Sequence, residues 1–315
     1  MKRKSIIISI ASFKLTKEEE NLIKNKKPWG IILFKRNIKN IEQVKELTSH
    51  IRLVMKDSCY PIMVDQEGGR VARLSKIIDT SDFSQNLFGK LFEKNKLLGI
   101  NSYNEYLGFT CQILKEIGIN INTIPVLDVL KNNTHEIIGD RSYSKKLNTI
   151  NSLKKICFTT LNKFKIGSVS KHIPGHGCSD VDTHKKLSAV NTSLNLLLKQ
   201  DFKVFKNINS KFAMTAHIIY KKIDPLHTAT HSKILIKNII RNKLGFRGIL
   251  ISDDISMKAL SGDLIYNAKT AIKSGCNLVL YCKGNIKESS ALLSKINDID
   301  NFTKKKTSEF YRFLR

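Results

Sequence analysis

The chain has 315 residues, 41% of them hydrophobic and 26% charged, so it is long enough for one barrel-sized domain or two smaller ones of ordinary globular composition. Its net charge of +27 could indicate nucleic acid, an anionic membrane surface or an acidic substrate as partner. The excess is almost all lysine and is spread along the whole chain. We therefore interpret it as solvated surface and A+T-rich codon usage, and we expect no nucleic-acid partner.

The first residues resemble a signal peptide only superficially. After three basic residues the apolar run over 5–13 is short, and charges return at Lys14 and Lys17. No segment approaches the ~20 apolar residues of a membrane-spanning helix. The six cysteines form no CxxC pair, which favours a reducing compartment over a disulfide framework or a zinc site. We expect a cytoplasmic protein with no membrane partner.

Short apolar runs alternate with longer amphipathic segments along the whole chain. The runs are almost continuously hydrophobic, which is typical of strands that are buried on both faces of a parallel sheet. They lie at 6–10, 30–34, 61–65, 119–129, 166–173, 212–219, 248–253 and 277–282.

The segments between these runs have helical patterns. Thr16 and Glu19 have the spacing of a capping box, and apolar residues from Ile41 to Val54 recur at steps of three and four. Further helices are predicted at 103–117, 153–164, 194–207, 232–244, 264–274 and 289–296. Eight strands that alternate with helices predict a single (β/α)8 TIM-type barrel, and no GxGxxG follows the first strand to favour a doubly wound sheet. We expect one domain over 1–315 with a terminal helix over about 301–315.

Polar residues stand where most of the predicted strands end, and in such a barrel these ends form the active site. In chain order they are Asp65, Glu67, Arg70 and Arg73, then Asp128, Asp140 and Arg141, then Lys171 and His172, then His217, and finally Asp253 and Asp254. The segment 171–184 (KHIPGHGCSDVDTH) has the densest chemistry, with three histidines, two aspartates and two glycines. A strand that runs into such a loop favours a functional site over an ordinary surface loop.

Each of these residues has a structural alternative. Asp128 could cap an element, Arg141 could form a surface ion pair worth little, and His217 could be a hydrogen-bonded histidine of the core. Aspartate, glutamate and histidine could also bind a metal. However, no HxH or HExxH spacing occurs, and Arg73, Arg141 and Lys171 would oppose a cation. We expect no metal and no cofactor, and a neutral, hydroxyl-rich or modestly anionic ligand.

Five ordered motifs resemble the β-N-acetylhexosaminidases of glycoside hydrolase family 3, of the single-domain, peptidoglycan-recycling type. They are 64–74 (VDQEGGRVARL), 124–129 (IPVLDV), 138–142 (IGDRS), 171–177 (KHIPGHG) with DTH at 182–184, and 244–257 (LGFRGILISDDISM). Segments 15–19 and 30–37 also match, so the resemblance extends over nearly the whole chain. One departure is Cys178, where relatives commonly have an acidic residue; the spacing from Lys171 to His184 is kept, so we expect altered loop behaviour and intact chemistry.

The resemblance implies a role for each matched position. Asp253 corresponds to the nucleophile, and His184 to the acid/base group, which Asp182 orients in an Asp–His dyad. Histidine titrates near neutrality, so it can give a proton in the first step and take one in the second. The residues that would hold the sugar's hydroxyls are Asp65, Arg73, Arg141, Lys171 and His172.

These matches imply a retaining exo-β-N-acetylglucosaminidase that removes terminal N-acetylglucosamine from muropeptides of the GlcNAc-1,6-anhydroMurNAc type in peptidoglycan recycling. We expect a monomer whose partner is a small carbohydrate. Two alternatives remain open: a family 3 phosphorylase that uses phosphate as acceptor, and, from a different class, a basic nucleic-acid-binding protein.

Overall fold

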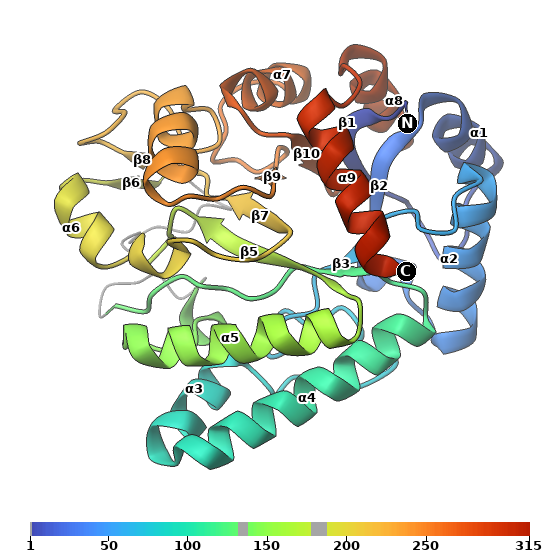
Figure 1. Ribbon diagram of the computed structural model, residues 1–315. Coiled ribbons are helices and arrows are strands. Elements are labelled where there is room, and N and C mark those ends of the chain that lie inside the picture. Colours follow the sequence, from blue (N-terminus) through green and yellow to red (C-terminus); the bar gives the residue numbers. More distant parts are fainter. Residues whose placement is uncertain (1, 132–137, 178–187) are drawn as a thin grey trace.

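The computed structural model describes residues 2–131, 138–177 and 188–315, and these form a closed barrel of eight parallel strands (Figure 1). The barrel strands are β1 (Lys4–Ser9), β2 (Pro28–Leu33), β3 (Ile62–Val64), β4 (Ile121–Asn122), β5 (Gly167–Ile173), β7 (Phe212–Thr215), β9 (Ile249–Asp254) and β10 (Leu278–Tyr281). They pair in this order, and β10 pairs with β1, where Leu280 lies opposite Ile7, to close the barrel. The predicted (β/α)8 fold is confirmed.

Helices connect successive strands and cover the outside of the barrel. They are α1 (Lys17–Lys26), α2 (Ile41–Met55), α3 (Gln85–Lys94), α4 (Lys96–Glu116), α5 (Leu147–Lys163), α6 (Leu194–Lys199), the π-helix η4 (Leu235–Lys243), α7 (Leu264–Ser274), α8 (Ile286–Lys295) and the terminal α9 (Asn301–Leu314). The predicted capping box at Thr16 and Glu19 is present at the start of α1. Within the described residues, no helix is both long enough and apolar enough to span a membrane.

The barrel strands are hydrophobic on both faces because two apolar cores share them. In β1, Ile6 and Ile8 pack outward against the helices, whereas Ile7 points into the barrel. Alternate residues of a strand face opposite sides, so each strand contributes to both cores. This explains the near-continuous apolar runs in the sequence.

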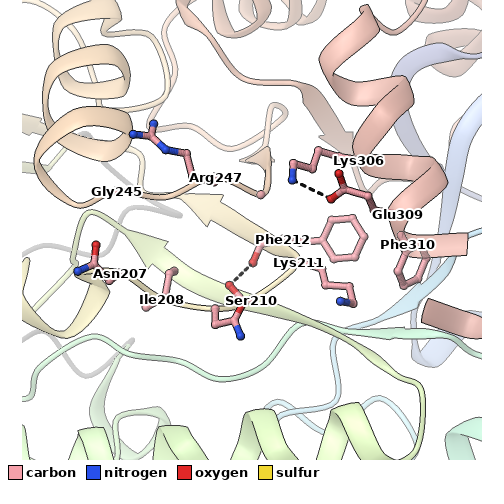
Figure 2. Close-up of a pocket in the computed structure, with 12 residues that line it drawn as sticks. Asn207, Ile208, Ser210, Lys211, Phe212, Gly245, Arg247, Lys306, Glu309 and Phe310 are labelled. Atoms are coloured by element: carbon pink, nitrogen blue, oxygen red, sulfur yellow. Dashed lines mark hydrogen bonds and ion pairs between the residues drawn. The ribbon is translucent and has the colours of Figure 1, made fainter. Parts of the chain in front are cut away.

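The N-terminal end of the barrel is closed by α9, which crosses the strands in Figure 1. The rings of Phe310 and Phe212 meet edge to face with centroids 5.1 Å apart, and Trp29 Nε1 donates to Thr307 Oγ1 at 2.9 Å. Beside α9 lies a cavity of about 400 Å³ that is lined by Lys211, Lys306 and other charged side chains (Figure 2). Its basic residues outnumber its acidic ones, as they do over the whole chain, so its charge does not mark it as a binding site.

Two apolar runs form shorter barrel strands than we predicted. The run 119–129 contributes only β4. Beyond Asn122, Val126 N donates to the side chain of Gln85, while Leu127 N still donates to Lys171 O of the neighbouring strand β5. The run 212–219 divides into β7 and β8 (Ile218–Tyr220), which leaves the barrel and pairs with β6 (Ser188–Val190).

The predicted helices are present, but their bounds and form differ in places, and one helix was missed. Helix α3 was not predicted at all, and the segment predicted at 232–244 is a wide π-helix over most of its length. The segment predicted at 194–207 contains only the short α6 and the 3-10 helix η3 (Lys203–Phe205).

Candidate active site

The C-terminal end of the barrel contains a polar cavity of about 180 Å³. Six of the eight predicted site residues line it: Asp65, Arg73, Arg141, Lys171, His172 and Asp253. Other lining residues include Phe34, Thr123, Met214, Asp254, Met257, Leu280 and Cys282. The other two, Asp182 and His184, lie outside the described residues, as does Cys178. The fold thus brings the predicted strand-end residues from β3, β5, β9 and the connection after β4 together around one cavity.

Asp65 follows β3 directly and receives three hydrogen bonds. Lys171 Nζ approaches its Oδ1 at 2.5 Å, Arg73 donates to its Oδ2 at 2.9 Å, and Thr123 Oγ1 donates to Oδ1. Burial disfavours the charged carboxylate, but the cations of Lys171 and Arg73 outweigh burial and hold the pKa of Asp65 well below its usual range. Asp65 is therefore ionised and accepts hydrogen bonds at the cavity wall.

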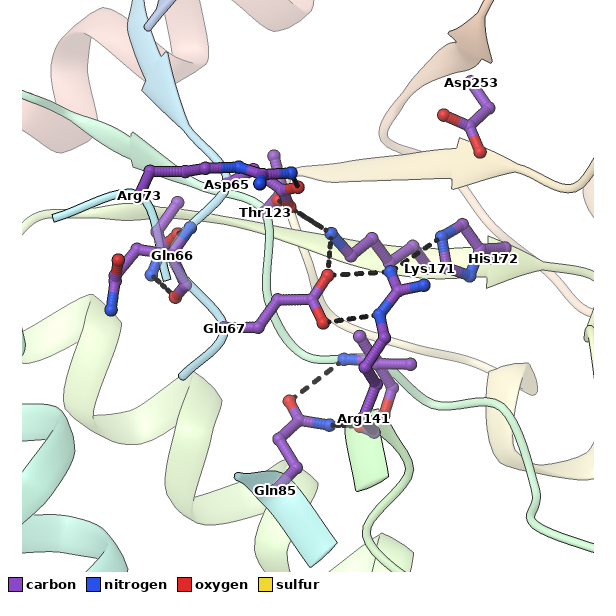
Figure 3. A network of polar contacts seen from close by, with 12 residues as sticks. Asp65, Gln66, Glu67, Arg73, Gln85, Thr123, Arg141, Lys171, His172 and Asp253 are labelled. Carbon is purple, nitrogen blue, oxygen red and sulfur yellow. Dashed lines mark hydrogen bonds and ion pairs between the residues drawn. The ribbon is translucent and has the colours of Figure 1, made fainter. Parts of the chain in front are cut away.

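Behind the cavity wall, Glu67 binds two of the lining cations at once (Figure 3). Arg141 donates Nε and an Nη to the two oxygens of Glu67 at 2.7 and 2.8 Å, and Lys171 Nζ lies 2.6 Å from Oε1. Burial opposes ionisation of Glu67, yet the charges of Arg141 and Lys171 still lower its pKa. For Arg141, burial acts against the charged form, but Glu67 raises the pKa of the guanidinium above its ordinary value.

Asp128 organises the point where β5 runs into the loop. It is fully buried and accepts from His172 Nδ1 at 2.7 Å, from the His172 backbone at 3.2 Å and from the His176 backbone at 2.7 Å. Burial raises and His172 lowers the pKa of Asp128, and the net shift is downward. His172 thus presents Nε2 toward the cavity side, 3.5 Å from an Nη of Arg141.

The start of the loop after β5 is packed tightly against its surroundings. A Cβ on Gly177 would come within 2.0 Å of Val129 O, so only glycine fits, and Gly175 has a φ of +144°. Tyr220 of β8 donates to Gly175 O. Burial lowers the pKa of His176 to about 4, so this histidine is neutral near pH 7.

The Ser-Asp-Asp segment ends β9, and its two aspartates have different surroundings. Asp254 accepts from Ser256 Oγ at 2.7 Å and from the Cys282 backbone at 3.3 Å, and burial raises its pKa. Asp253 accepts from the Asp254 backbone at 2.8 Å. Figure 3 shows Asp253 set apart from the cluster around Lys171. Asp253 is the position that the family resemblance predicts as the nucleophile.

His217 forms a hydrogen bond with the backbone of this segment. Its Nε2 lies 3.0 Å from Asp254 O, which can only accept, so Nε2 carries the proton and Nδ1 accepts from Thr230 Oγ1 at 2.7 Å. Burial lowers the pKa of His217 although Asp253 opposes the shift. His217 is a hydrogen-bonded core histidine, one of the two roles that the sequence allowed.

No group of three metal-binding side chains is present within 2–131, 138–177 and 188–315. The cavity instead combines acceptor carboxylates with donor guanidinium and ammonium groups, and His172 between them. Hydroxyl groups both donate and accept, so a sugar can satisfy such a wall on every side. A (β/α)8 barrel that presents a carboxylate beside such a wall has the arrangement of a glycoside hydrolase.

Comparison with known proteins gives the same class. The model of the glycosyl hydrolase family 3 N-terminal domain matches residues 3–309. A beta-hexosaminidase of Neisseria meningitidis serogroup A is 32% identical over 286 residues, which cover 89% of this chain and 78% of the relative; one of Aromatoleum aromaticum is 29% identical over 282 residues, 88% of this chain and 78% of the relative. This chain belongs to glycosyl hydrolase family 3 and is a glycoside hydrolase.

A solved structure is similar over the whole chain. NagZ from Neisseria gonorrhoeae, crystallised with N-trifluoroacetyl-D-glucosamine, has a TM-score of 0.88 and 28% sequence identity, and the match covers 100% of this chain and 90% of that one. A family 3 beta-N-acetylglucosaminidase from a Paenibacillus species, at 22% identity and a TM-score of 0.86, has the same fold; the match covers 98% of this chain and 60% of that one.

Sequence reasoning did not assign a site role to Glu67, Gln85 or Asp128. Glu67 and Asp128 were visible as acidic residues near strand ends. Gln85 had no such signal: its side chain bonds Val126 and the backbone oxygen of Arg141, at 2.9 and 2.6 Å, across more than 40 positions of sequence.

Proposed function

We propose that the chain is a retaining exo-β-N-acetylglucosaminidase. The observation that carries this proposal is the shared cavity, in which Asp253 on β9 and the hydroxyl-binding residues Asp65, Arg141, Lys171 and His172 line one space. The names of the related beta-hexosaminidases and NagZ structures support the sugar specificity. The cavity has a volume of about 180 Å³, and exo action on a terminal sugar is what the family resemblance implies.

In the first step, a carboxylate oxygen of Asp253 attacks the anomeric carbon while the glycosidic C–O bond breaks. The leaving oxygen takes a proton from His184, which Asp182 orients. The product is a covalent glycosyl-enzyme. The dyad roles come from the family resemblance.

In the second step, neutral His184 takes a proton from water, and the resulting hydroxide attacks the anomeric carbon. The bond to Asp253 breaks, and the sugar leaves with its original β configuration. The ionised Asp65 and the cations beside it hold the ring's hydroxyls through both steps. Contacts that strengthen as the ring flattens toward an oxocarbenium ion lower the barrier.

Phosphorolysis is not favoured by the cavity wall. Arg73, Arg141 and Lys171 each form an ion pair with Asp65 or Glu67. A phosphate acceptor would have to compete with these carboxylates, whereas a water molecule would not.

For the aglycone, we propose the anhydromuramyl peptide of a muropeptide, in cytoplasmic peptidoglycan recycling, with residues 1–315 acting as one catalytic domain. The support is the resemblance to the peptidoglycan-recycling type and the similarity to NagZ.

The test is product analysis by NMR. An aryl β-N-acetylglucosaminide should release β-N-acetylglucosamine first, and phosphate should not divert it to the 1-phosphate. A muropeptide should be turned over more efficiently than chitobiose. An initial α product would contradict retention, and an inactive protein would contradict the proposed function.

A further inference from the structure

Glu67 is a carboxylate that lies almost completely enclosed behind the cavity wall. Its side chain is 1% exposed, compared with 17% for Asp65, and it is absent from the cavity wall that Asp65 lines. The chain folds back directly after it: Glu67 N donates to Val71 O at 2.9 Å, and Gly68 and Gly69 have φ of +89° and +59°. This turn directs two residues that are only two positions apart to different places, Asp65 to the cavity and Glu67 behind it.

Both oxygens of Glu67 are occupied by the side chains that the proposed function assigns to the sugar. One guanidinium edge of Arg141 uses both oxygens, and the ammonium of Lys171 uses one. The side chain of Arg141 is 10% exposed and that of Lys171 2%, so each depends on buried partners for its orientation. The planar fork of an arginine on a carboxylate fixes direction as well as distance.

Without the Glu67 charge, two cations would face each other in a site with little water. They would separate by rotating toward solvent. Arg141 would then lose the contact that orients its guanidinium, whose Glu67-bonded Nη also lies 3.5 Å from His172 Nε2. Asp65 cannot replace Glu67, because Arg73, Thr123 and Lys171 already occupy it.

We propose that Glu67 is a positioning residue: its buried carboxylate holds Arg141 and Lys171 in the orientations in which they bind the hydroxyls of the sugar. The role rests on the proposed function, since it acts through the residues that this function assigns to substrate. Glu67 touches no substrate itself.

The test begins with Glu67→Gln, which keeps the size and removes the charge. We expect kcat/KM for an aryl β-N-acetylglucosaminide to fall roughly 10- to 100-fold. Activity changes by a similar factor in metalloenzymes when a residue that orients a metal ligand is removed. In an Arg141→Met, Lys171→Met background the same substitution should change kcat/KM less than about threefold, because the side chains that Glu67 positions are gone. Equal effects in the two backgrounds, or wild-type kinetics in Glu67→Gln, would overturn the proposal.

A second variant covers the case in which Glu67→Gln does not fold. Glu67→Asp keeps the charge but is one methylene shorter, so it cannot hold both cations. We expect folded protein with reduced kcat/KM, and unchanged kcat/KM would contradict the role.

The matched control is Asp57→Asn at the opposite end of the barrel. Asp57 also pairs with a buried arginine, Arg3, and accepts from Tyr311 at 2.6 Å, but it lies away from the cavity. It should lower the melting temperature and leave KM unchanged. If KM rises equally in both variants, Glu67 has only a structural role.

One readout does not depend on turnover. A guanidinium held by a two-point bond is rigid, so the Nε–H of Arg141 should give a resolved NMR signal, assigned by its absence in Arg141→Lys. This signal should broaden or vanish in Glu67→Gln and persist in Asp57→Asn. An inactive wild-type protein would contradict the proposed function, and an unchanged Arg141 signal would contradict the role of Glu67.

Discussion

The two ends of the barrel are built from the same strands and have opposite chemistry. At the N-terminal end, Trp29 and Phe212 of the barrel and Phe310 of α9 form an aromatic cluster. At the C-terminal end, ion pairs among Asp65, Glu67, Arg73, Arg141 and Lys171 surround a cavity. Apolar burial stabilises without direction, whereas buried charges do so only with well-oriented partners. Apolar packing therefore closes one end of the barrel, and oriented polar groups surround the cavity at the other.

The largest effect should come from Asp253, where the chemistry is concentrated. Asp253→Asn removes the attacking oxygen while keeping the shape, so kcat should fall by about 10⁴-fold or more, with the melting temperature nearly unchanged. Steady-state kinetics and calorimetry would measure both. A fall in kcat of less than tenfold would indicate that another residue of the cavity is the nucleophile.

His184→Ala should reduce turnover of substrates with poor leaving groups by about 10²- to 10⁴-fold, because their departure requires a proton. Aryl glycosides with acidic phenols need little protonation, so they should lose much less in the first step. Rates for a series of leaving groups would show this as a steeper dependence on leaving-group pKa. Parallel losses across the series would exclude His184 as the acid.

At the other end, Phe310→Ala should cost about 3–5 kcal/mol of the free energy of unfolding, because it opens a cavity in a fully buried aromatic cluster. Urea unfolding would measure the loss, and KM of the remaining folded protein should stay at the wild-type value. A raised KM would show that the two ends are coupled.

Acid should weaken the cavity end. The folded pKa values of Asp65 and Glu67 are lowered: burial opposes this shift, but Lys171, Arg73 and Arg141 outweigh it. Their contribution to stability is therefore complete above the unfolded values near 4 and is lost as pH falls through the folded ones. Unfolding free energy between pH 5 and 2.5 should fall less steeply in Asp65→Asn than in wild type, and identical slopes would contradict the assignment.

The same contrast shows what a sequence can predict. Strand-end residues such as Asp65, Lys171 and Asp253 follow from apolar runs because a strand that is buried on both faces has a recognisable end. Arg73 and Arg141 were also noted near strand ends, but their role in holding the sugar came from the family resemblance, since loop paths have no period. The sequence could not predict that Asp65 lines the cavity while Glu67 lies behind it, because this depends on how the Gly68-Gly69 turn orients the two carboxylates.

The shortened β4 has a similar cause. The apolar run 119–129 has no internal signal that regular strand pairing is interrupted after Asn122, because Val126 N donates to the side chain of Gln85, far away in sequence. The same limit applies to β7 and β8, where one apolar run serves the barrel and then a separate sheet.

The central claim, that Asp253 is the nucleophile of this cavity, is tested most directly by trapping the intermediate. A slow fluorinated N-acetylglucosaminyl donor should increase the mass of the protein by one sugar, and peptide mapping should place the adduct on the peptide that contains Asp253. Absence of an adduct while the donor is consumed, or an adduct on another carboxylate, would contradict the account.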